Sequence, residues 1–279
     1  MTASDMAVFP ERRTSRRAQW AKRLSFFAGV LFVVAGFGHR FGVVDTLAFL
    51  SVLGIVGMLA LLGLLLAISG FSRLWRYGDK AGKASLAASL MSAAVLAPFL
   101  IGAFCALRYP MFYDVATDPV DPPQFERAAS LRTARMNPIV PITPENARLQ
   151  MERYPEVRGR RYDISADQIV QALETVIRSR GWALSGSLYQ AGMPEFVIEA
   201  YAPTLVLGFP VDAVFRVTDE GGTTFVDMRM NSRYGRHDLG DGARRVARFM
   251  SDLDAEVTRQ AKAIVDIPPS SGGEEDGVD

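Results

Sequence analysis

Two groups of charged residues have the types and spacing that could do chemistry, one acidic and one basic. The acidic group is Asp114, Asp118 and Asp121, in the segment DVATDPVDPPQF. Closely spaced carboxylates can act as general acids and bases or hold a hard metal ion. These aspartates stand among prolines, however, where an aspartate commonly accepts backbone hydrogen bonds and forms a turn. We favour the turn interpretation.

The basic group surrounds the expected start of the last helix. The segment SRYGRHDLGDGARR, residues 232–245, is rich in arginine, and a helix N-terminus there would add partial positive charge. If the domain has a binding site, we expect it at this arginine corner, with one aromatic and one acidic residue beside it. Arginines that flank a helix start are also common surface residues, and this alternative stays open. The candidate residues are Arg233, Arg236, Arg244, Arg245, Phe209 and Asp212.

No catalytic constellation is recognisable elsewhere in the sequence. The two histidines, His39 and His237, are far apart in the chain, and the single cysteine, Cys105, excludes an intramolecular disulfide. Neither a glycine-rich phosphate loop nor the ligand spacing of a zinc site is present. We therefore predict no catalytic residue, no metal and no cofactor.

A hydrophobic block from Leu24 to Leu107 dominates the first part of the chain. About 20 apolar residues span the hydrocarbon core of a bilayer, and three stretches approach or exceed that length. They are about 23–42, 46–70 and 84–107. A mean hydropathy of +0.12 and a hydrophobic content of 49% fit a chain that is part membrane and part soluble.

The first stretch is the least regular, because its apolar run is followed by His39 and Arg40. We interpret it as a span, with Trp20 and Lys22 at one headgroup layer and His39 and Arg40 at the other. A cleaved signal peptide is the competing interpretation. The two hydrophobic stretches that follow favour an uncleaved, multi-pass anchor.

The distribution of lysine and arginine predicts the orientation. The N-terminal head, residues 1–22, and the connection after the second span are rich in these residues, whereas the first connection has Arg40 beside Asp45. The positive-inside rule then puts the head in the cytoplasm. Three spans deliver everything after Arg108 to the opposite side, which in a bacterium is the periplasm. We expect the head to bind no nucleic acid.

Small residues recur four apart along the third stretch, at Ser85, Ser89, Ala93 and Ala97, with Ala84, Ala88 and Ser92 alongside. Helices in lipid associate through close backbone approach over small side chains, so we expect this face to pack against another helix. No ionisable residue lies deep within any stretch, which argues against a proton relay or ion pathway.

Residues 108–267 are predicted to form a soluble α+β domain. Its first part, about 109–162, is rich in proline and is expected to wrap the domain surface as extended chain with turns. A helix should follow, with a capping box of Ser165 and Gln168 and a terminating glycine at Gly181. The last helix should run from an N-cap at Asp238 to about residue 265.

Four antiparallel strands are expected between these two helices, at Trp182–Tyr189, Glu195–Tyr201, Asp212–Thr218 and Thr224–Arg233. Alternation gives the sheet an apolar face that should pack on both helices. The other face carries Glu199, Arg216, Asp227, Arg229 and Arg233. We favour a solvated ladder of opposite charges on this second face. The alternative is an anion or phospholipid headgroup site built from its arginines.

Two further segments have distinct compositions. The apolar loop LVLGFP, residues 205–210, is most simply a cover for the core, with contact to lipid as the alternative. Residues 268–279 form an acidic tail without a core-forming pattern, and we expect it to be disordered.

Several segments together resemble the domain-of-unknown-function family 1499. They are DVATDPVDPPQF (114–125), NPIV (137–140), YPEV (154–157), GFPVD (208–212) and, above all, SRYGRHDLGDGARR (232–245). The resemblance covers about residues 112–262, and many bacterial members carry N-terminal membrane spans, as here. It implies the α+β architecture and no particular activity. Two positions depart from the family pattern, Val211 and Gly242.

Our first functional hypothesis is a bacterial inner-membrane protein that presents a periplasmic, non-catalytic binding or structural module. Its partners would be the lipid bilayer and an envelope lipid or protein. The second hypothesis is an envelope hydrolase or transferase that uses Asp118, Asp121 and Asp212 as acids or bases. The two differ in geometry, because catalysis requires the three carboxylates to converge on one pocket.

Overall fold

The computed structural model describes residues 15–77, 82–187 and 193–265, which fall into two compact units. One unit comprises Met1–Arg108 together with Leu205–Gly208, and the other comprises Tyr109–Thr204 and Phe209–Asp279. Some predictions lie outside the described residues. They are most of the basic head, the whole acidic tail and the last two residues of the strand expected at 182–189.

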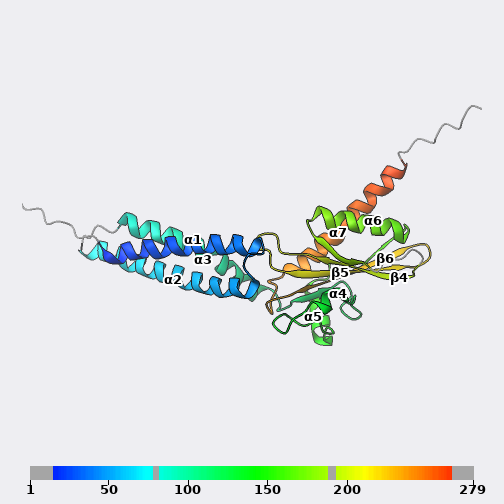
Figure 1. Ribbon diagram of the computed structural model, residues 1–279, viewed down its shortest axis with the longest axis horizontal. Helices are drawn as coiled ribbons and strands as arrows, with labels where there is room; N and C mark the ends of the chain where they lie inside the picture. The colour runs from blue at the N-terminus through cyan, green and yellow to red at the C-terminus, as the bar shows by residue number, and fades with distance from the viewer. Residues whose placement is uncertain (1–14, 78–81, 188–192, 266–279) are drawn as a thin grey trace, which may run out of the picture. The chain divides into compact units, whose positions relative to one another are not determined.

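Three long helices make up the first unit: α1 (Arg16–Arg40), α2 (Thr46–Tyr77) and α3 (Gly82–Arg108) (Figure 1). Each is long and apolar enough to cross a membrane. Helix α1 begins at Arg16, several residues before the predicted start of the span at residue 23. The charged residues that precede the apolar segment are part of the same helix. With 25 residues, α1 is longer than the roughly 20 residues that span a bilayer, although its uninterrupted apolar run is shorter than that.

Small side chains pack the three helices together. The hydroxyl oxygens of Ser25 and Ser92 lie 2.8 Å apart, and a Cβ added at Gly63 would lie 2.6 Å from the Ser25 oxygen. The buried residues of α3 are Ser85, Ala88, Ser92 and Val95. Ser85 belongs to the predicted row of residues four apart, and Ala88 and Ser92 to the small residues predicted beside it, whereas Ser89, Ala93 and Ala97 are not buried. Four residues turn an α-helix by about 400°, and steps of four therefore drift off a fixed face by about 40° each.

The second unit is an α+β domain built on an antiparallel sheet in the order β1-β6-β5-β4-β3, with β2 also paired to β6. The long strands are β4 (Glu195–Tyr201), β5 (Val211–Asp219) and β6 (Thr224–Ser232). Short strands are β1 (Asp114–Ala116), β2 (Arg160–Tyr162) and β3 (Ala183–Ser187). Helices α6 (Ala166–Ser179) and α7 (Asp241–Val265) cover one face of this sheet, and α4 (Arg127–Ser130) and α5 (Pro144–Arg153) lie on the other (Figure 1).

Local signals place the two long helices of the domain as predicted. The Ser165 side chain accepts from the Gln168 backbone, and the Gln168 side chain accepts from the Ser165 backbone, which completes the capping box of α6. Gly181 ends the helix with φ at +67°, a conformation that favours glycine. At the last helix, the Asp238 carboxylate accepts backbone hydrogen bonds ahead of α7. The helix begins at Asp241, so Asp238 lies three residues before it rather than at the expected N-cap position, although its carboxylate still accepts the N–H of Gly242 in the first turn.

The apolar face of the sheet forms the core with α6 and α7. The nine strand residues that alternation directs to this face are all buried: Phe196, Ile198, Ala200, Ala213, Phe215, Val217, Val226, Met228 and Met230. Trp182 stacks on Phe249 of α7 with ring centroids 5.3 Å apart, and the Phe215 ring packs at a tilt against Phe249, 4.6 Å away. The apolar loop behaves differently. Leu205 and Val206 are 84% and 78% exposed, so they do not cover the core.

The proline-rich first part of the domain holds structure that the sequence analysis missed. The sheet has six strands rather than four, because β1 and β2 pair with successive parts of the same edge of β6. Both are three residues long and have no alternation long enough to recognise. Because β1 and β2 both pair with β6, this part of the chain nonetheless runs along the domain, as expected.

Candidate functional site

The charged face of the sheet is buried, and the prediction of a solvated ladder is wrong. Glu199, Asp227 and Arg229 are each at most 3% exposed, because the segment between β1 and α5 lies over them. Apolar contacts hold this cover in place: Phe125 and Ala128 from the segment form a buried cluster with strand residue Val214. Alternation had identified two faces correctly, but it carries no information about what covers the second one.

Arg229 is the centre of the buried charges. Its Nε and Nη2 donate to the two oxygens of Asp114 at 2.8 and 2.7 Å, and Asn231 adds a hydrogen bond to the same carboxylate at 3.0 Å. The guanidinium also donates to the carbonyl oxygens of Val140, at 2.8 Å, and Pro123, at 3.3 Å. One side chain thus ties β6 to β1 and to two points of the covering segment.

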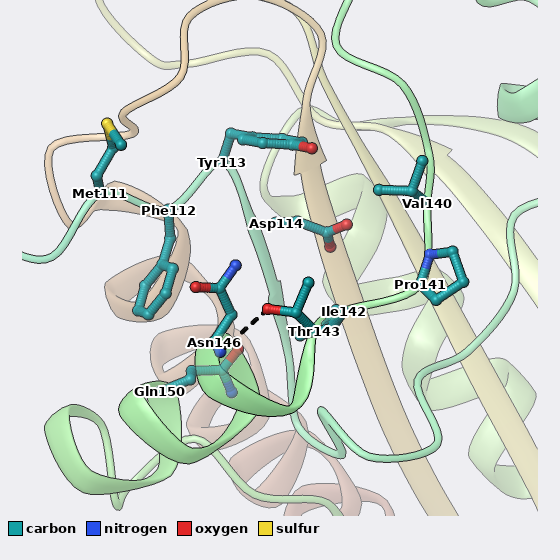
Figure 2. A pocket seen from close by; sticks show the side chains of 10 residues that line it. All are labelled: Met111, Phe112, Tyr113, Asp114, Val140, Pro141, Ile142, Thr143, Asn146 and Gln150. Carbon is teal, nitrogen blue, oxygen red and sulfur yellow. Dashed lines mark hydrogen bonds between the residues drawn. The ribbon is translucent and has the colours of Figure 1, made fainter.

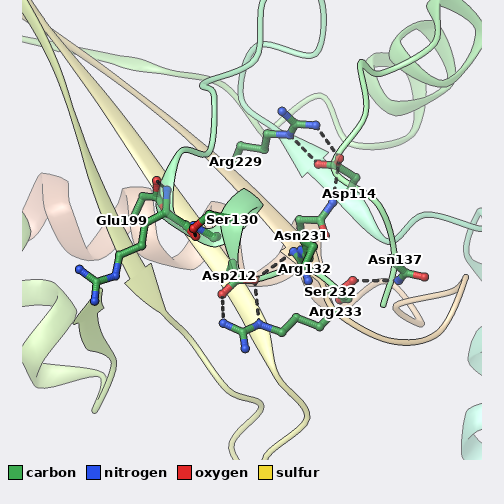
Figure 3. Close-up of polar contacts among 12 residues, drawn as sticks. Asp114, Ser130, Arg132, Asn137, Glu199, Asp212, Arg229, Asn231, Ser232 and Arg233 are labelled. Carbon is green, nitrogen blue, oxygen red and sulfur yellow. Dashed lines mark hydrogen bonds and ion pairs between the residues drawn. The ribbon is translucent and has the colours of Figure 1, made fainter. Parts of the chain in front are cut away.

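A second ion-pair cluster adjoins the first at Asn231 (Figure 3). Arg233 donates to both oxygens of Asp212 at 2.9 and 2.7 Å, and its guanidinium lies over the Tyr201 ring. Arg132, from the covering segment, lies 2.9 Å from Asp212 and 2.8 Å from the Asn231 side-chain oxygen. Burial lowers the pKa of Arg132, and the hydrogen bonds that Arg233 donates to Asp212 raise the pKa of Arg233. We call the two clusters together the polar layer: Asp114, Arg132, Asp212, Arg229, Asn231 and Arg233.

Glu199 satisfies a different part of the covering segment. Its carboxylate accepts the backbone N–H groups of Glu126, Arg127 and Ala128 at 2.6, 2.9 and 2.8 Å. These are donors at the start of the short helix α4, which has no side-chain cap of its own. A buried carboxylate on the sheet therefore serves as the cap for a helix that lies above it.

The residues of the predicted arginine corner divide among separate partners. Arg233 and Asp212 form the ion pair just described, whereas Arg245 donates to the Ala202 carbonyl at 2.7 Å and stacks on Trp182. Arg244 lies over the Tyr109 ring instead. The other two candidates are Arg236, which is exposed, and Phe209, whose backbone bonds to that of Thr204.

A cavity of about 120 Å³ lies beside the polar layer and shares Asp114 with it (Figure 2). Two segments line this partly open space: residues 111–114, which end at the start of β1, and residues 140–150, which run into α5. No member of the arginine corner lines it. Sequence analysis missed this cavity, although TPEN, residues 143–146, has the threonine cap and following proline typical of a helix start. The lining residues are Met111, Phe112, Tyr113, Asp114, Val140, Pro141, Ile142, Thr143, Asn146 and Gln150.

The family described as "Protein of unknown function (DUF1499)" matches residues 114–253, half of the chain. The chain belongs to this family. The matched region holds all six strands of the sheet and the whole polar layer. A comparison with curated proteins found no match.

The DUF1499 domain keeps the three aspartates of the hydrolase hypothesis apart. Asp118 accepts the backbone N–H groups of Val120 and Asp121, as a turn-forming aspartate does. The Asp121 side chain is 76% exposed and pairs with Arg216 at 2.8 Å. Arg216 is four residues along β5 from Asp212, a distance of about 13 Å on an antiparallel strand.

Asp238 gives the DUF1499 domain a pH-dependent contribution to stability. Its carboxylate accepts the N–H groups of Gly240 and Gly242 at 2.8 and 2.9 Å. Burial is the main cause that raises the pKa of Asp238 from 3.8 to about 6. The folded state therefore binds the proton more tightly, so the stability from this group is complete below pH 3.8 and is lost as the pH rises through about 6.

We expect the free energy of unfolding of the wild type to fall by up to about 3 kcal/mol, relative to Asp238→Asn, between pH 3.5 and pH 6.5. Urea unfolding of both proteins across this range measures the difference, in which other titrating groups cancel. Parallel pH profiles for the two proteins would contradict the raised pKa.

Proposed function

We propose that this protein is a multi-pass protein of the bacterial inner membrane, with a cytoplasmic N-terminus, that presents its DUF1499 domain in the periplasm as a non-catalytic binding module. Three helices able to cross a membrane support the anchoring. The lysines and arginines of the head and of the connection between α2 and α3 support the orientation. The envelope component that the domain binds would be a lipid or a protein.

The observation that carries the non-catalytic role is the pairing of the buried charges. An acid or base needs a carboxylate that reaches the substrate. In the described part of the domain, the buried carboxylates of Asp114, Asp212 and Asp227 are each bound by an arginine, and that of Glu199 by three backbone groups. Such a network stabilises one arrangement of the sheet and its cover, and it leaves the neighbouring cavity as the place for a ligand.

The hydrolase or transferase alternative has weaker support. Its three carboxylates have separate partners, and the exposed Asp121 pairs with Arg216, about 13 Å along β5 from Asp212. Convergence on one pocket, which this mechanism needs, is absent among these three residues.

The orientation is tested with fusions to alkaline phosphatase, which folds to its active form only after export. We expect high activity for a fusion after Asp279, at the end of the full chain, and activity near background for a fusion after Tyr77, in the connection between α2 and α3. A matched fusion of a fluorescent protein that matures only in the cytoplasm should show the reverse pattern. Active phosphatase after Tyr77 would overturn the orientation.

The binding role is tested by native mass spectrometry of the full chain, purified from its own membranes in mild detergent. We expect a mass above that of the chain alone, from a retained envelope lipid or protein that dissociates on activation. Incubation with the released component should leave that component chemically unchanged. Conversion of it into a product would favour the enzyme alternative.

A further inference from the structure

We propose that the cavity between β1 and α5 binds a small uncharged group with several hydroxyls, of about the size of glycerol. This inference rests on the proposed binding role and specifies its ligand. The cavity is the partly open space lined by residues 111–114 and 140–150, and Figure 2 shows side chains of both segments around it.

The size of the cavity limits the ligand. A cavity of about 150 Å³ in a protein interior holds benzene, which has six non-hydrogen atoms. At about 120 Å³, this cavity accepts a group of similar or slightly smaller size. A lipid chain or a sugar chain would have to remain outside, with a terminal group inserted.

Unused hydrogen-bonding groups line the space. Within the described parts of the chain, neither the Tyr113 hydroxyl nor the Asn146 side-chain amide forms a hydrogen bond, while Thr143 accepts one from the Asn146 backbone and still has its own proton to donate. Gln150, by contrast, is already bonded at both ends of its amide, because its oxygen accepts the N–H of Ala116 and its nitrogen donates to the carbonyl of Ala116. The available set contains donors and acceptors together, which suits hydroxyl groups.

The charge of the lining disfavours an ionic ligand. Asp114 is the charged residue of the described lining, and Arg229 and Asn231 already bind its two oxygens. A phosphate or ammonium group would therefore give up part of its water shell in the cavity without gaining a free opposite charge, which disfavours it relative to a neutral group. A hydroxyl can instead donate to a remaining lone pair of Asp114 without disturbing the ion pair.

The apolar part of the lining suits the C–H edge of the same ligand. Phe112, Ile142 and Val140 line the space; Phe112 is 5% exposed, Ile142 is half-buried and Val140 is 44% exposed. In the sequence, Met111 follows the last residue of the third membrane helix by three positions. Both a free polyol and the glycerol headgroup of a lipid share the required chemistry, and the experiment separates these two sources.

The test uses the full chain in nanodiscs of a choline-headgroup phospholipid and saturation-transfer NMR of added glycerol. We expect clear transfer to glycerol from the wild type and at least a five-fold loss in Asn146→Trp, whose ring fills the cavity. Asn146→Ala, which removes one hydrogen-bonding group, should weaken glycerol binding about five-fold. Arg148→Trp is the matched control on the same helix, since Arg148 does not line the cavity and is exposed, and it should bind glycerol as the wild type does.

Nanodiscs made with a glycerol-headgroup phospholipid identify the source. Loss of transfer to free glycerol in these discs would assign the site to the lipid, and unchanged transfer would assign it to a free polyol. Equal transfer from the wild type and Asn146→Trp would overturn the proposal, as would displacement of glycerol by ethanolamine or inorganic phosphate at lower concentrations than glycerol itself requires. If glycerol does not bind while another envelope component co-purifies with the chain, the glycerol-sized ligand is contradicted and the proposed binding function is retained.

Discussion

Replacing Arg229 with methionine is expected to lower the free energy of unfolding of the DUF1499 domain by about 3–5 kcal/mol. The Arg229 side chain is 1% exposed, and its partner Asp114 is 11% exposed. Methionine keeps much of the apolar stem but leaves the Asp114 carboxylate buried without its counter-charge. The carbonyls of Val140 and Pro123 also lose their donor, so the covering segment loses two of its attachments.

The measurement is urea unfolding of the full chain in detergent, followed by Trp182 fluorescence in a background where Trp20 and Trp75 are phenylalanine. Trp182 is buried against Phe249 and reports on the domain core alone. Arg178→Met is the matched control, because Arg178 is 71% exposed and pairs with Glu174 one helical turn away. It should cost about 0.5 kcal/mol or less.

A second variant separates charge from shape at this site. Combining Asp114→Asn with Arg229→Met removes the uncompensated charge and should recover part of the lost stability, so the two substitutions will not be additive. A loss below about 1 kcal/mol for Arg229→Met alone would contradict a stabilising role for this ion pair.

The sequence predicts elements whose signals are local. The capping box at Ser165 and Gln168, the glycine at 181 and the apolar periods of the long helices and strands act within a few residues, and the structure has these elements where the sequence indicates. The three hydrophobic helices follow for the same reason, because the length and apolar composition of one segment decide them.

The missed features depend on pairs of segments far apart in the chain. Strand β1 exists because residues 114–116 pair with residues 229–231, and nothing within three residues announces that pairing. The burial of Arg229 has the same origin, since alternation cannot reveal that residues near position 125 cover it. The cavity is also a product of two segments, and its key lining residue, Asn146, is an ordinary exposed helix residue in the sequence.

The candidate binding residues Asp212 and Arg233 were expected at a ligand site, and the structure has them in a buried ion-pair cluster. Asp212 and Arg233 do meet, as the arginine corner required, but within the polar layer and with Arg132 as a third partner that no nearby sequence pattern suggests. Arginine and aspartate in one cluster are compatible with ligand binding and with stability. Only the effect of removing them tells these roles apart.

Replacing Asp212 with alanine is expected to lower the free energy of unfolding by about 3–4 kcal/mol, the second-largest effect that we predict. The Asp212 side chain is 3% exposed and neutralises both Arg132 and Arg233, which are 9% and 20% exposed. Nε and Nη1 of Arg132 have no hydrogen-bond partner in the described chain, so without Asp212 this guanidinium keeps the Asn231 oxygen alone. Arg233→Ala should cost less, about 1–2 kcal/mol, because water reaches the Arg233 side chain.

Asp252→Ala is the matched control for Asp212→Ala, because Asp252 also pairs with an arginine, Arg180 at 2.6 Å, but is 53% exposed. Its cost should stay below about 1 kcal/mol. The contrast decides between two roles for Asp212. A large loss of stability together with unchanged ligand retention, measured below the unfolding transition, assigns it to the structure of the polar layer. Near-normal stability with lost turnover of an envelope substrate would instead revive the carboxylate enzyme, since a buried aspartate that the fold does not need must be kept for another reason.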